Sequence, residues 1–147
     1  MNKFKTMDDM IKFLVKNSTQ IMQEIIDEEI IPTMLEVIDE KVYRAYKPKV
    51  YERRYEHGGL ADPTNFDSTI DIYDNTIEIS VKNITMPKDD SEYVFLDTII
   101  VNGCKNLPMK RDFYEATREV LRDELPNIIT KKFKEHGIDV KFKVKIR

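Results

Sequence analysis

The sequence predicts an α+β fold in a single domain that comprises residues 1–147. Three patterns predict it: apolar residues at helical spacing in both terminal thirds, a central pair of alternating runs around a two-residue turn, and strict alternation at the C-terminus. The length of 147 residues suits one core, and 41% hydrophobic residues, with seven Phe and seven Tyr, are enough to fill it.

Residues 1–46 are predicted to form a long helical region. Apolar residues recur there at intervals of three and four, and after Pro32 the stripe resumes in a different phase. Because proline lacks an N–H and clashes with the preceding turn, we expect a kink, or a break with Pro32 in the first turn of a second helix. The stripe consists of Met7, Ile11, Leu14, Ser18, Ile21 and Ile25 before the proline, and of Leu35, Ile38, Val42 and Ala45 after it.

Residues 47–68 are predicted to form a long loop. The chain around it is rich in tyrosine and basic residues, and it passes through Gly58-Gly59 and Asp62-Pro63, which favour turns. Loops of this length inside compact domains are usually functional or disordered, and the tyrosines argue against disorder. The sequence therefore indicates a loop that makes contacts.

A β region is predicted over residues 69–103. Residues 69–73 and 76–81 alternate apolar and polar side chains on either side of Asp74-Asn75, a pattern typical of a β-hairpin. Residues 93–101 form a further apolar run rich in β-formers. We expect these segments to form an antiparallel sheet with the hairpin at its centre.

The C-terminal part is predicted to form one long helix over residues 111–136 and a final strand over residues 138–146. Pro126 should kink or divide the helix, and Gly137 is placed to cap its C-terminal end. Apolar and charged residues alternate along the strand, so it should pair at the edge of the sheet with one oily and one cationic face. The helix residues expected to face inward are Phe113, Thr117, Val120, Leu121, Ile128 and Phe133.

Composition argues against membrane and secreted classes. The longest apolar runs are a few residues, whereas a membrane span needs roughly 20, and acidic residues follow the N-terminal lysines before any apolar run of signal-peptide length. One cysteine, Cys104, excludes an internal disulfide and a multi-thiolate zinc site. We therefore expect the protein to stay in the cytosol of the cell that makes it, without a membrane partner.

The sequence lacks the patterns of a catalytic centre, so we predict that the protein is not an enzyme and has no catalytic residue, metal, cofactor or small-molecule substrate. His57 and His136 each lie next to glycine without partners at metal-ligand spacing, which favours surface or capping roles. There is no nucleophile elbow and no phosphate-binding glycine loop. Asp71, Glu78 and Lys82 have the residue types of a nuclease, but the solvated face of an ordinary hairpin has them too.

Opposite charges lie in different segments, which suggests self-association. Residues 24–40 contain seven acidic and no basic residues, whereas the final strand is cationic on one face. A second hypothesis is a nucleic-acid-binding module that uses the Tyr/Arg/Lys loop at residues 43–55. Lysine and arginine side chains neutralise phosphate groups, and aromatic side chains stack on nucleobases. The net charge of −3, from 24 basic and 27 acidic residues, argues against a dedicated binder.

Several segments resemble the small neck proteins of long-tailed bacteriophages, also called head-tail joining or tail-completion proteins. Tyr51-Glu52-Arg53-Arg54 and Leu60, leading into Asn65-Phe66-Asp67-Ser68-Thr69-Ile70, resemble the loop after the N-terminal helix of that family. Lys110-Arg111-Asp112-Phe113-Tyr114-Glu115-Ala116 looks like the start of its long C-terminal helix, and Glu135-His136-Gly137-Ile138-Asp139-Val140 is similar to the exit of that helix.

The resemblance implies a virion structural protein that joins the capsid portal or connector to the tail as one subunit of an oligomeric ring. It implies location in the neck or tail of the virion, in the host cytoplasm during assembly, with nucleic acid present only as passing DNA. In a head-to-tail ring each subunit needs two different complementary surfaces. The alternative interpretations are a solvated helix face for the acidic stretch and a packed intrachain clamp for the loop. The residues chosen for the interface are Tyr46, Tyr51, Arg53, Arg54, Tyr55, Glu28, Glu29, Glu36, Lys141, Lys143 and Lys145.

Overall fold

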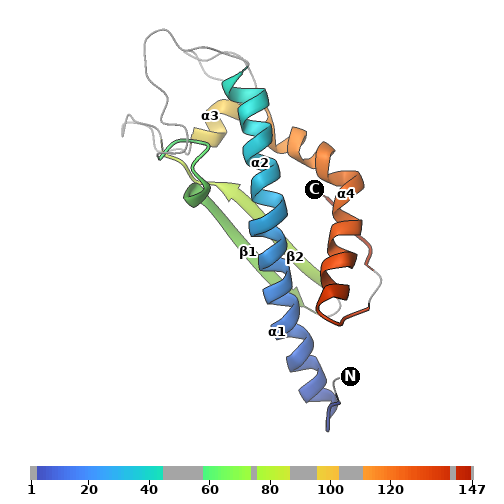
Figure 1. The fold of residues 1–147 in the computed structure, drawn as a ribbon. Coiled ribbons are helices and arrows are strands. Elements are labelled where there is room, and N and C mark those ends of the chain that lie inside the picture. The colour runs from blue at the N-terminus through green and yellow to red at the C-terminus, as the bar shows by residue number, and fades with distance from the viewer. Residues whose placement is uncertain are drawn as a thin grey trace.

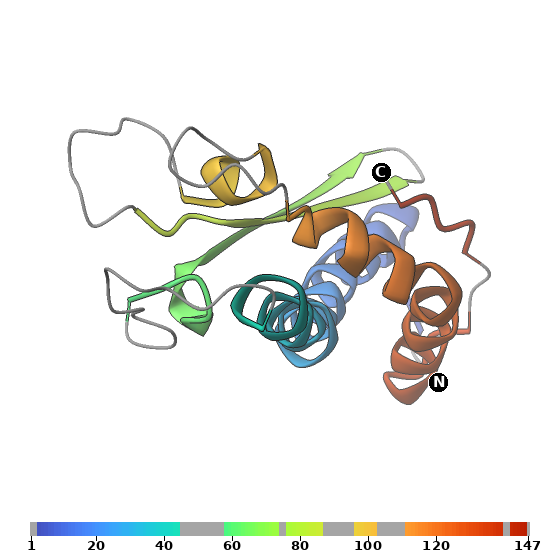
Figure 2. The same cartoon turned by 90° about the horizontal axis from the view of Figure 1, so that it is seen from above.

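The computed structural model describes residues 3–44, 58–73, 76–86, 96–102, 111–139 and 142–146. A long N-terminal helical region lies across one side of a two-stranded antiparallel sheet, and a long C-terminal helix lies beside it (Figures 1 and 2). This arrangement confirms the predicted α+β class. Cys104 and His57 lie outside the described residues.

The N-terminal helical region runs without a break from Met7 to Tyr43. It consists of α1 (Met7–Ile25), a π-helical turn (Ile26–Ile30), α2 (Ile31–Ile38) and a second π-helical turn (Asp39–Tyr43), which Figure 1 shows as one long rod. Thr6 caps its start by accepting a hydrogen bond from the backbone N–H of Asp9.

Pro32 lies in the first turn of α2, as expected, but a π-helical turn replaces the expected kink or break. The N–H of Ile31 donates to the carbonyl of Ile26, five residues earlier, just before the proline that has no N–H to give. Because a π-helical turn accommodates an extra residue, the apolar face changes phase there. This explains why the stripe before Pro32 does not continue in register after it.

The predicted apolar stripe is buried only in its second part. Ser18, Ile21 and Ile25 are buried, whereas Met7, Ile11 and Leu14 are exposed, because the first half of α1 extends past the rest of the fold (Figure 1). After Pro32 the buried residues are Met34, Val37, Ile38 and Val42, with Leu35 half-buried; Ala45 lies outside the described residues.

The sheet is the predicted hairpin, longer at its open end than expected. Strand β1 (Phe66–Tyr73) pairs with β2 (Thr76–Asn83), with Ile70 opposite Ile79. Residues 66–68 therefore belong to the sheet and not to the loop, which is a correction of the predicted boundary. Even-numbered residues of β1 and odd-numbered residues of β2 face the helices, and the other face is exposed.

The prediction of a strand over residues 93–101 is wrong for its described part, which is helical. Helix α3 spans Leu96–Asn102, and Asp97 in its first turn is buried, with 2% of its surface exposed. The N–H of Leu96 donates to the carbonyl of Thr85, and the N–H of Arg111 donates to the carbonyl of Ile100. These tertiary contacts override the strand propensity of the β-branched residues.

Helix α4 (Phe113–Glu135) matches the predicted C-terminal helix within two residues at each end. Its buried residues recur every four positions, and because four residues turn a helix by about 400°, this row rotates around the helix axis. Phe113 therefore packs in one core cluster and the later residues pack in another. The helix is bent along its length and not divided at Pro126 (Figure 1). The buried row consists of Phe113, Thr117, Leu121, Leu125, Ile129 and Phe133.

Two of the predicted inward positions on α4 need correction. Val120 is 46% exposed and Ile128 is half-buried, while Leu125 and Ile129 take the inward places. The prediction from a period of 3.6 residues assumes that a straight helix packs with one face against a single element. Here the buried row follows two neighbours in turn, so the spacing of four is the better guide.

The predicted strand at residues 138–146 is also wrong where it is described. Residues 142–146 are outside the two-stranded sheet, and Val140, Lys141 and Arg147 lie outside the described residues. The alternating pattern nevertheless corresponds to alternating burial. Phe142, Val144 and Ile146 pack on the core, whereas Lys143 and Lys145 are exposed. A period of two thus reports one buried face and not the backbone pairing that defines a strand.

Gly137 ends α4 with a Schellman motif, as predicted. The φ of Gly137 is +79°. The N–H of Gly137 donates to the carbonyl of Lys134 at 3.0 Å, and the N–H of Ile138 donates to the carbonyl of Phe133 at 2.9 Å. A Cβ at this position meets no atom within 4 Å, so only the backbone conformation opposes a side chain.

We expect Gly137→Ala to lower the free energy of unfolding by about 1 kcal/mol, because alanine resists a positive φ. Gly137→Asn is the matched control and should cost less, since asparagine tolerates the left-handed region better. Urea denaturation of the three proteins measures the difference. Equal stability of the alanine and glycine proteins would contradict the role of the cap.

Candidate functional site

The structure describes five of the eleven residues chosen for the interface. Tyr46, Tyr51, Arg53, Arg54, Tyr55 and Lys141 lie outside the described residues. Lys143 and Lys145 are exposed on the segment after α4, while the three glutamates lie on the long helix. The structure therefore locates the acidic part of the predicted surface and two of its lysines.

Part of the acidic surface is already paired within the chain. Glu28 forms an ion pair with Lys132 of α4, and Glu24 lies 3.0 Å from the imidazole of His136 at the end of the same helix. The hydrogen bond to Glu28 raises the pKa of Lys132 above its ordinary value. We call the acidic residues of positions 24–40 the acidic band. It continues beyond these two pairs, since Glu36 is exposed and Glu29 half-buried on the long helix.

One side-chain hydrogen bond, from Ala61 to Tyr43, joins the two described ends of the Tyr/Arg loop, and two further bonds lie within residues 58–65. The hydroxyl of Tyr43 accepts from the N–H of Ala61 at 3.1 Å, and the carboxylate of Asp62 accepts from the N–H of Gly58 at 2.8 Å. Asn65 donates to the carbonyl of Gly59. Tyr43 thus ties Ala61, at the base of the loop, to the C-terminal end of the long helix, while the loop tyrosines of the predicted clamp lie outside the described residues.

A buried polar network holds this base against the sheet and α4. The hydroxyl of Tyr114 donates to the carboxylate of Asp97 and accepts from the N–H of Asn83 at 2.9 Å. Asn83, fully buried, donates to the carbonyl of Leu60, and the N–H of Thr85 donates to its side-chain oxygen. Burial, and next the hydrogen bond to Asp97, raise the pKa of Tyr114 well above its ordinary value.

The hairpin residues with nuclease-like chemistry lie on its exposed face. Asp71 is directly opposite Glu78, which accepts a hydrogen bond from the hydroxyl of Tyr73 at 2.7 Å, and Lys82 is opposite Asp67. In the part of the chain that the structure describes, no group of three His, Cys, Asp or Glu residues is placed to hold a metal ion. None of the described helices is long and apolar enough to span a membrane.

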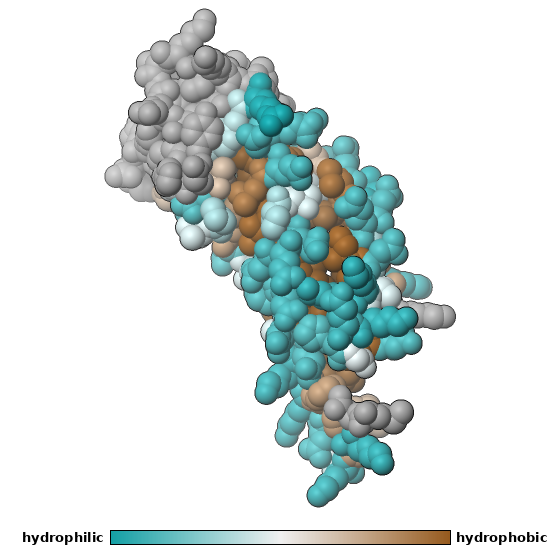
Figure 3. All heavy atoms as spheres, viewed as in Figure 1, coloured by the Kyte–Doolittle hydropathy of each residue, from teal (hydrophilic) through white to brown (hydrophobic). Residues whose placement is uncertain are grey.

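A hollow of about 270 Å³ lies between the long helix, β2, α4 and the C-terminal segment. Its lining is mixed: apolar residues such as Ile30 and Met34 of the long helix and Leu121 of α4 occur together with polar residues, among them the cationic Arg118 and Lys145. Hydrophobic residues are visible between the long helix and α4 in Figure 3, with hydrophilic residues around them. We call this hollow and its lining residues the α2/α4 groove.

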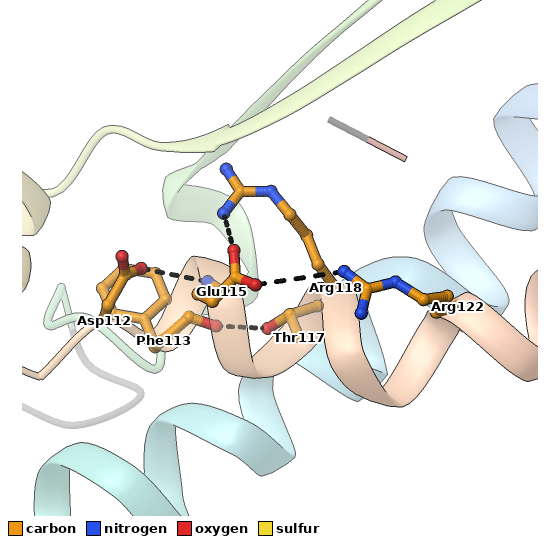
Figure 4. A network of polar contacts seen from close by, with 6 residues as sticks. All are labelled: Asp112, Phe113, Glu115, Thr117, Arg118 and Arg122. Carbon is orange, nitrogen blue, oxygen red and sulfur yellow. Dashed lines mark hydrogen bonds and ion pairs between the residues drawn. The ribbon is translucent and has the colours of Figure 1, made fainter. Parts of the chain in front are cut away.

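The cationic side of the α2/α4 groove is held in place at the start of α4 (Figure 4). Asp112 caps the helix by accepting from the N–H of Glu115 at 3.0 Å. The carboxylate of Glu115 then pairs with Arg118 at 3.0 Å and with Arg122 at 4.0 Å. Glu115 thus holds in place Arg118, which lines the groove.

A second surface lies at the opposite end of the long helix. We call it the α1 stripe, and it is formed by apolar residues of the first half of α1 and its N-terminal flank. Their exposed fractions are large for apolar side chains, and the rings of Phe4 and Phe13 lie 5.0 Å apart beside them. The stripe consists of Phe4 (37% exposed), Met7 (67%), Ile11 (49%), Leu14 (37%) and Val15 (42%).

Sequence reasoning found the stripe but treated it as core, and it missed the groove and the Tyr114 network. The continuous helical period gave no sign of where α1 leaves the fold, because exposure depends on the other elements. The network had one weak signal, the acidic Asp97 inside an apolar run.

Comparison with known proteins identifies one family. The family model described as YomN matches residues 6–136. This family is derived from Bacillus prophages, so the match makes the chain a phage-associated protein. No curated protein and no solved structure matches the chain.

Proposed function

This chain belongs to the YomN family, and from that premise we propose that it is a structural protein of the phage neck. In this proposal it joins the capsid portal or connector to the tail as one subunit of an oligomeric ring. Phage origin supports the proposal in general terms, and the sequence resemblance to neck proteins supports the specific position.

The observation that carries the proposal is the α1 stripe. A soluble protein that acts alone gains nothing from a row of exposed apolar side chains on a helix that extends past the fold, whereas such patches mark protein contacts. The acidic band of the long helix and the cationic side of the α2/α4 groove supply two further surfaces of opposite charge. A head-to-tail ring requires unlike surfaces of this kind.

The proposal is tested in the phage or prophage that encodes the chain. After deletion of the gene and induction, electron microscopy should show filled heads and separate tails, with joined particles restored when the wild-type gene is supplied in trans. Antibody labelling of wild-type particles should mark the neck. Normal numbers of joined particles from the deletion strain would contradict the proposal.

The Tyr/Arg loop is tested in the same assay. Arg53→Glu with Arg54→Glu should abolish complementation, because interface arginines often dominate binding energy, while the purified variant keeps the wild-type circular dichroism spectrum. Full complementation by this variant would remove the loop from the contact.

The nucleic-acid alternative makes a different prediction. A chain that binds DNA through the loop should retard single-stranded DNA in a gel at low salt, lose this at higher salt, and lose it also on the double charge reversal. The neck proposal expects no such retardation. A salt-sensitive complex would favour the alternative.

A further inference from the structure

We propose that the α1 stripe of one chain docks in the α2/α4 groove of a second copy of the same chain. This inference rests on the proposed function, because it names the two surfaces by which neighbouring subunits would join. It is carried by three observations: a preformed apolar helix face, a hollow with several apolar lining residues on another part of the same chain, and opposite charges beside them.

The stripe is presented on a well-formed helix. Thr6 caps the helix by accepting from Asp9, and Met7, Ile11 and Leu14 then recur at intervals of four and three on one face. The same face continues into the core at Ile21 and Ile25. The exposed part therefore has the residue pattern of a core helix but lacks a covering element among the described residues.

The groove has the size and chemistry to take this face. An apolar cavity of about 150 Å³ holds a benzene-sized group, so a hollow of about 270 Å³ accommodates one or two aliphatic side chains. Ile30, Met34 and Leu121 supply apolar walls. Apolar side chains of a helix inserted into such a hollow are a common mode of recognition between proteins.

Charges set the orientation. Asp8 lies beside the stripe, since it is 60° around the helix from Ile11 at 100° per residue, whereas Asp9 is 160° from Ile11 on the opposite face. The groove is lined by Arg118 and Lys145. Docking with the first turn of α1 toward these cations brings Asp8 against Arg118 of the neighbour.

The contact must join different chains in a head-to-tail manner. The stripe lies on the first half of α1, while the groove uses Ile30 and Met34 further along the same rigid helix, so one chain does not bring them together. Because the two surfaces are unlike, each chain can dock on one neighbour and receive another. Repetition of this contact generates a ring or an open filament.

Sedimentation velocity of the full chain tests the apolar part. We expect concentration-dependent association of the wild type, and Ile11→Asp should weaken it about 100-fold, since it places a charge where an aliphatic side chain is buried. Gln20→Asp puts the same charge on the exposed opposite face of α1 and should change the association less than about 2-fold. Both positions are exposed, so both variants should keep the wild-type circular dichroism spectrum and thermal midpoint.

Charge exchange tests the named partner surface. Asp8→Lys and Arg118→Glu should each weaken association about 2-fold to 5-fold, in line with exposed ion pairs. The double variant should regain wild-type association, and so should a mixture of the two single variants, because mixed contacts again join opposite charges. Asp9→Lys is the control on the other face of the helix and should have no effect.

Several outcomes would overturn the docking and leave the neck function standing. They are a wild-type chain that stays monomeric at all concentrations, an Ile11→Asp chain that associates like the wild type, and single charge variants whose defects the double variant does not reverse. Joined particles formed without the gene would instead refute the neck function, so the two failures are distinguishable.

Discussion

Replacing Phe133 with alanine is expected to lower the free energy of unfolding by about 3–5 kcal/mol. Phe133 is 1% exposed at the end of the buried row of α4, and its ring lies 4.7 Å from that of Phe142 in the C-terminal segment. Its removal leaves a cavity between α1, α4 and this segment. The loss should appear as a lower urea midpoint with an unchanged slope.

The matched control for this change is Val120→Ala. Val120 lies on the same helix but is 46% exposed, so its truncation should alter stability by about 0.5 kcal/mol or less. Because Phe142 loses its ring partner in the Phe133→Ala protein, limited proteolysis should also cut the C-terminal segment faster. Similar costs for the two substitutions would contradict the description of the core.

Replacing Tyr114 with phenylalanine is expected to cost about 2–3 kcal/mol. The ring remains, but the buried carboxylate of Asp97 loses a hydrogen-bond donor and the N–H of Asn83 loses its acceptor. Tyr73→Phe is the control, because it also deletes a tyrosine hydroxyl bonded to a carboxylate, that of Glu78, at a 51% exposed position. It should cost about 0.5 kcal/mol or less.

The same hydroxyl predicts a pH dependence. The pKa of Tyr114 is raised in the folded chain, so the folded state holds this proton more tightly than the unfolded state, in which the pKa is about 10. Its stabilisation is fully present below about pH 10 and declines as the pH rises above that value. As the pH rises above about 10, the wild type should therefore lose stability faster than Tyr114→Phe, and parallel losses would show that the hydroxyl does not contribute.

Local signals predicted the elements that local interactions determine. The hairpin followed from alternation around Asp74-Asn75, and the end of α4 followed from Gly137, because turn chemistry acts over a few residues. The phase change around Pro32 was visible in the sequence as well. The π-helical turn that produces the phase change was not visible in the sequence, because it depends on which carbonyl accepts the hydrogen bond from the N–H of Ile31.

The errors arose where tertiary contacts decide. Residues 96–102 have strand propensity, but the burial of Asp97 against Tyr114 belongs to a helix that no window of the sequence reveals. Val120 was expected to face inward but is exposed, and Leu125 is buried instead, because α4 passes from one core cluster to another. The candidate site was predicted only in part, since the groove is assembled from four segments distant in the sequence.

The unbroken helical region has a mechanical consequence. Its 19, 5, 8 and 5 residues make 37 in succession, which at 1.5 Å per residue give a strut of about 55 Å. Such a strut keeps its two extremities at a constant separation and transmits a tilt at one of them to the other. The strut would therefore act as a lever, so that a small rotation of one end would displace the other end by a larger distance.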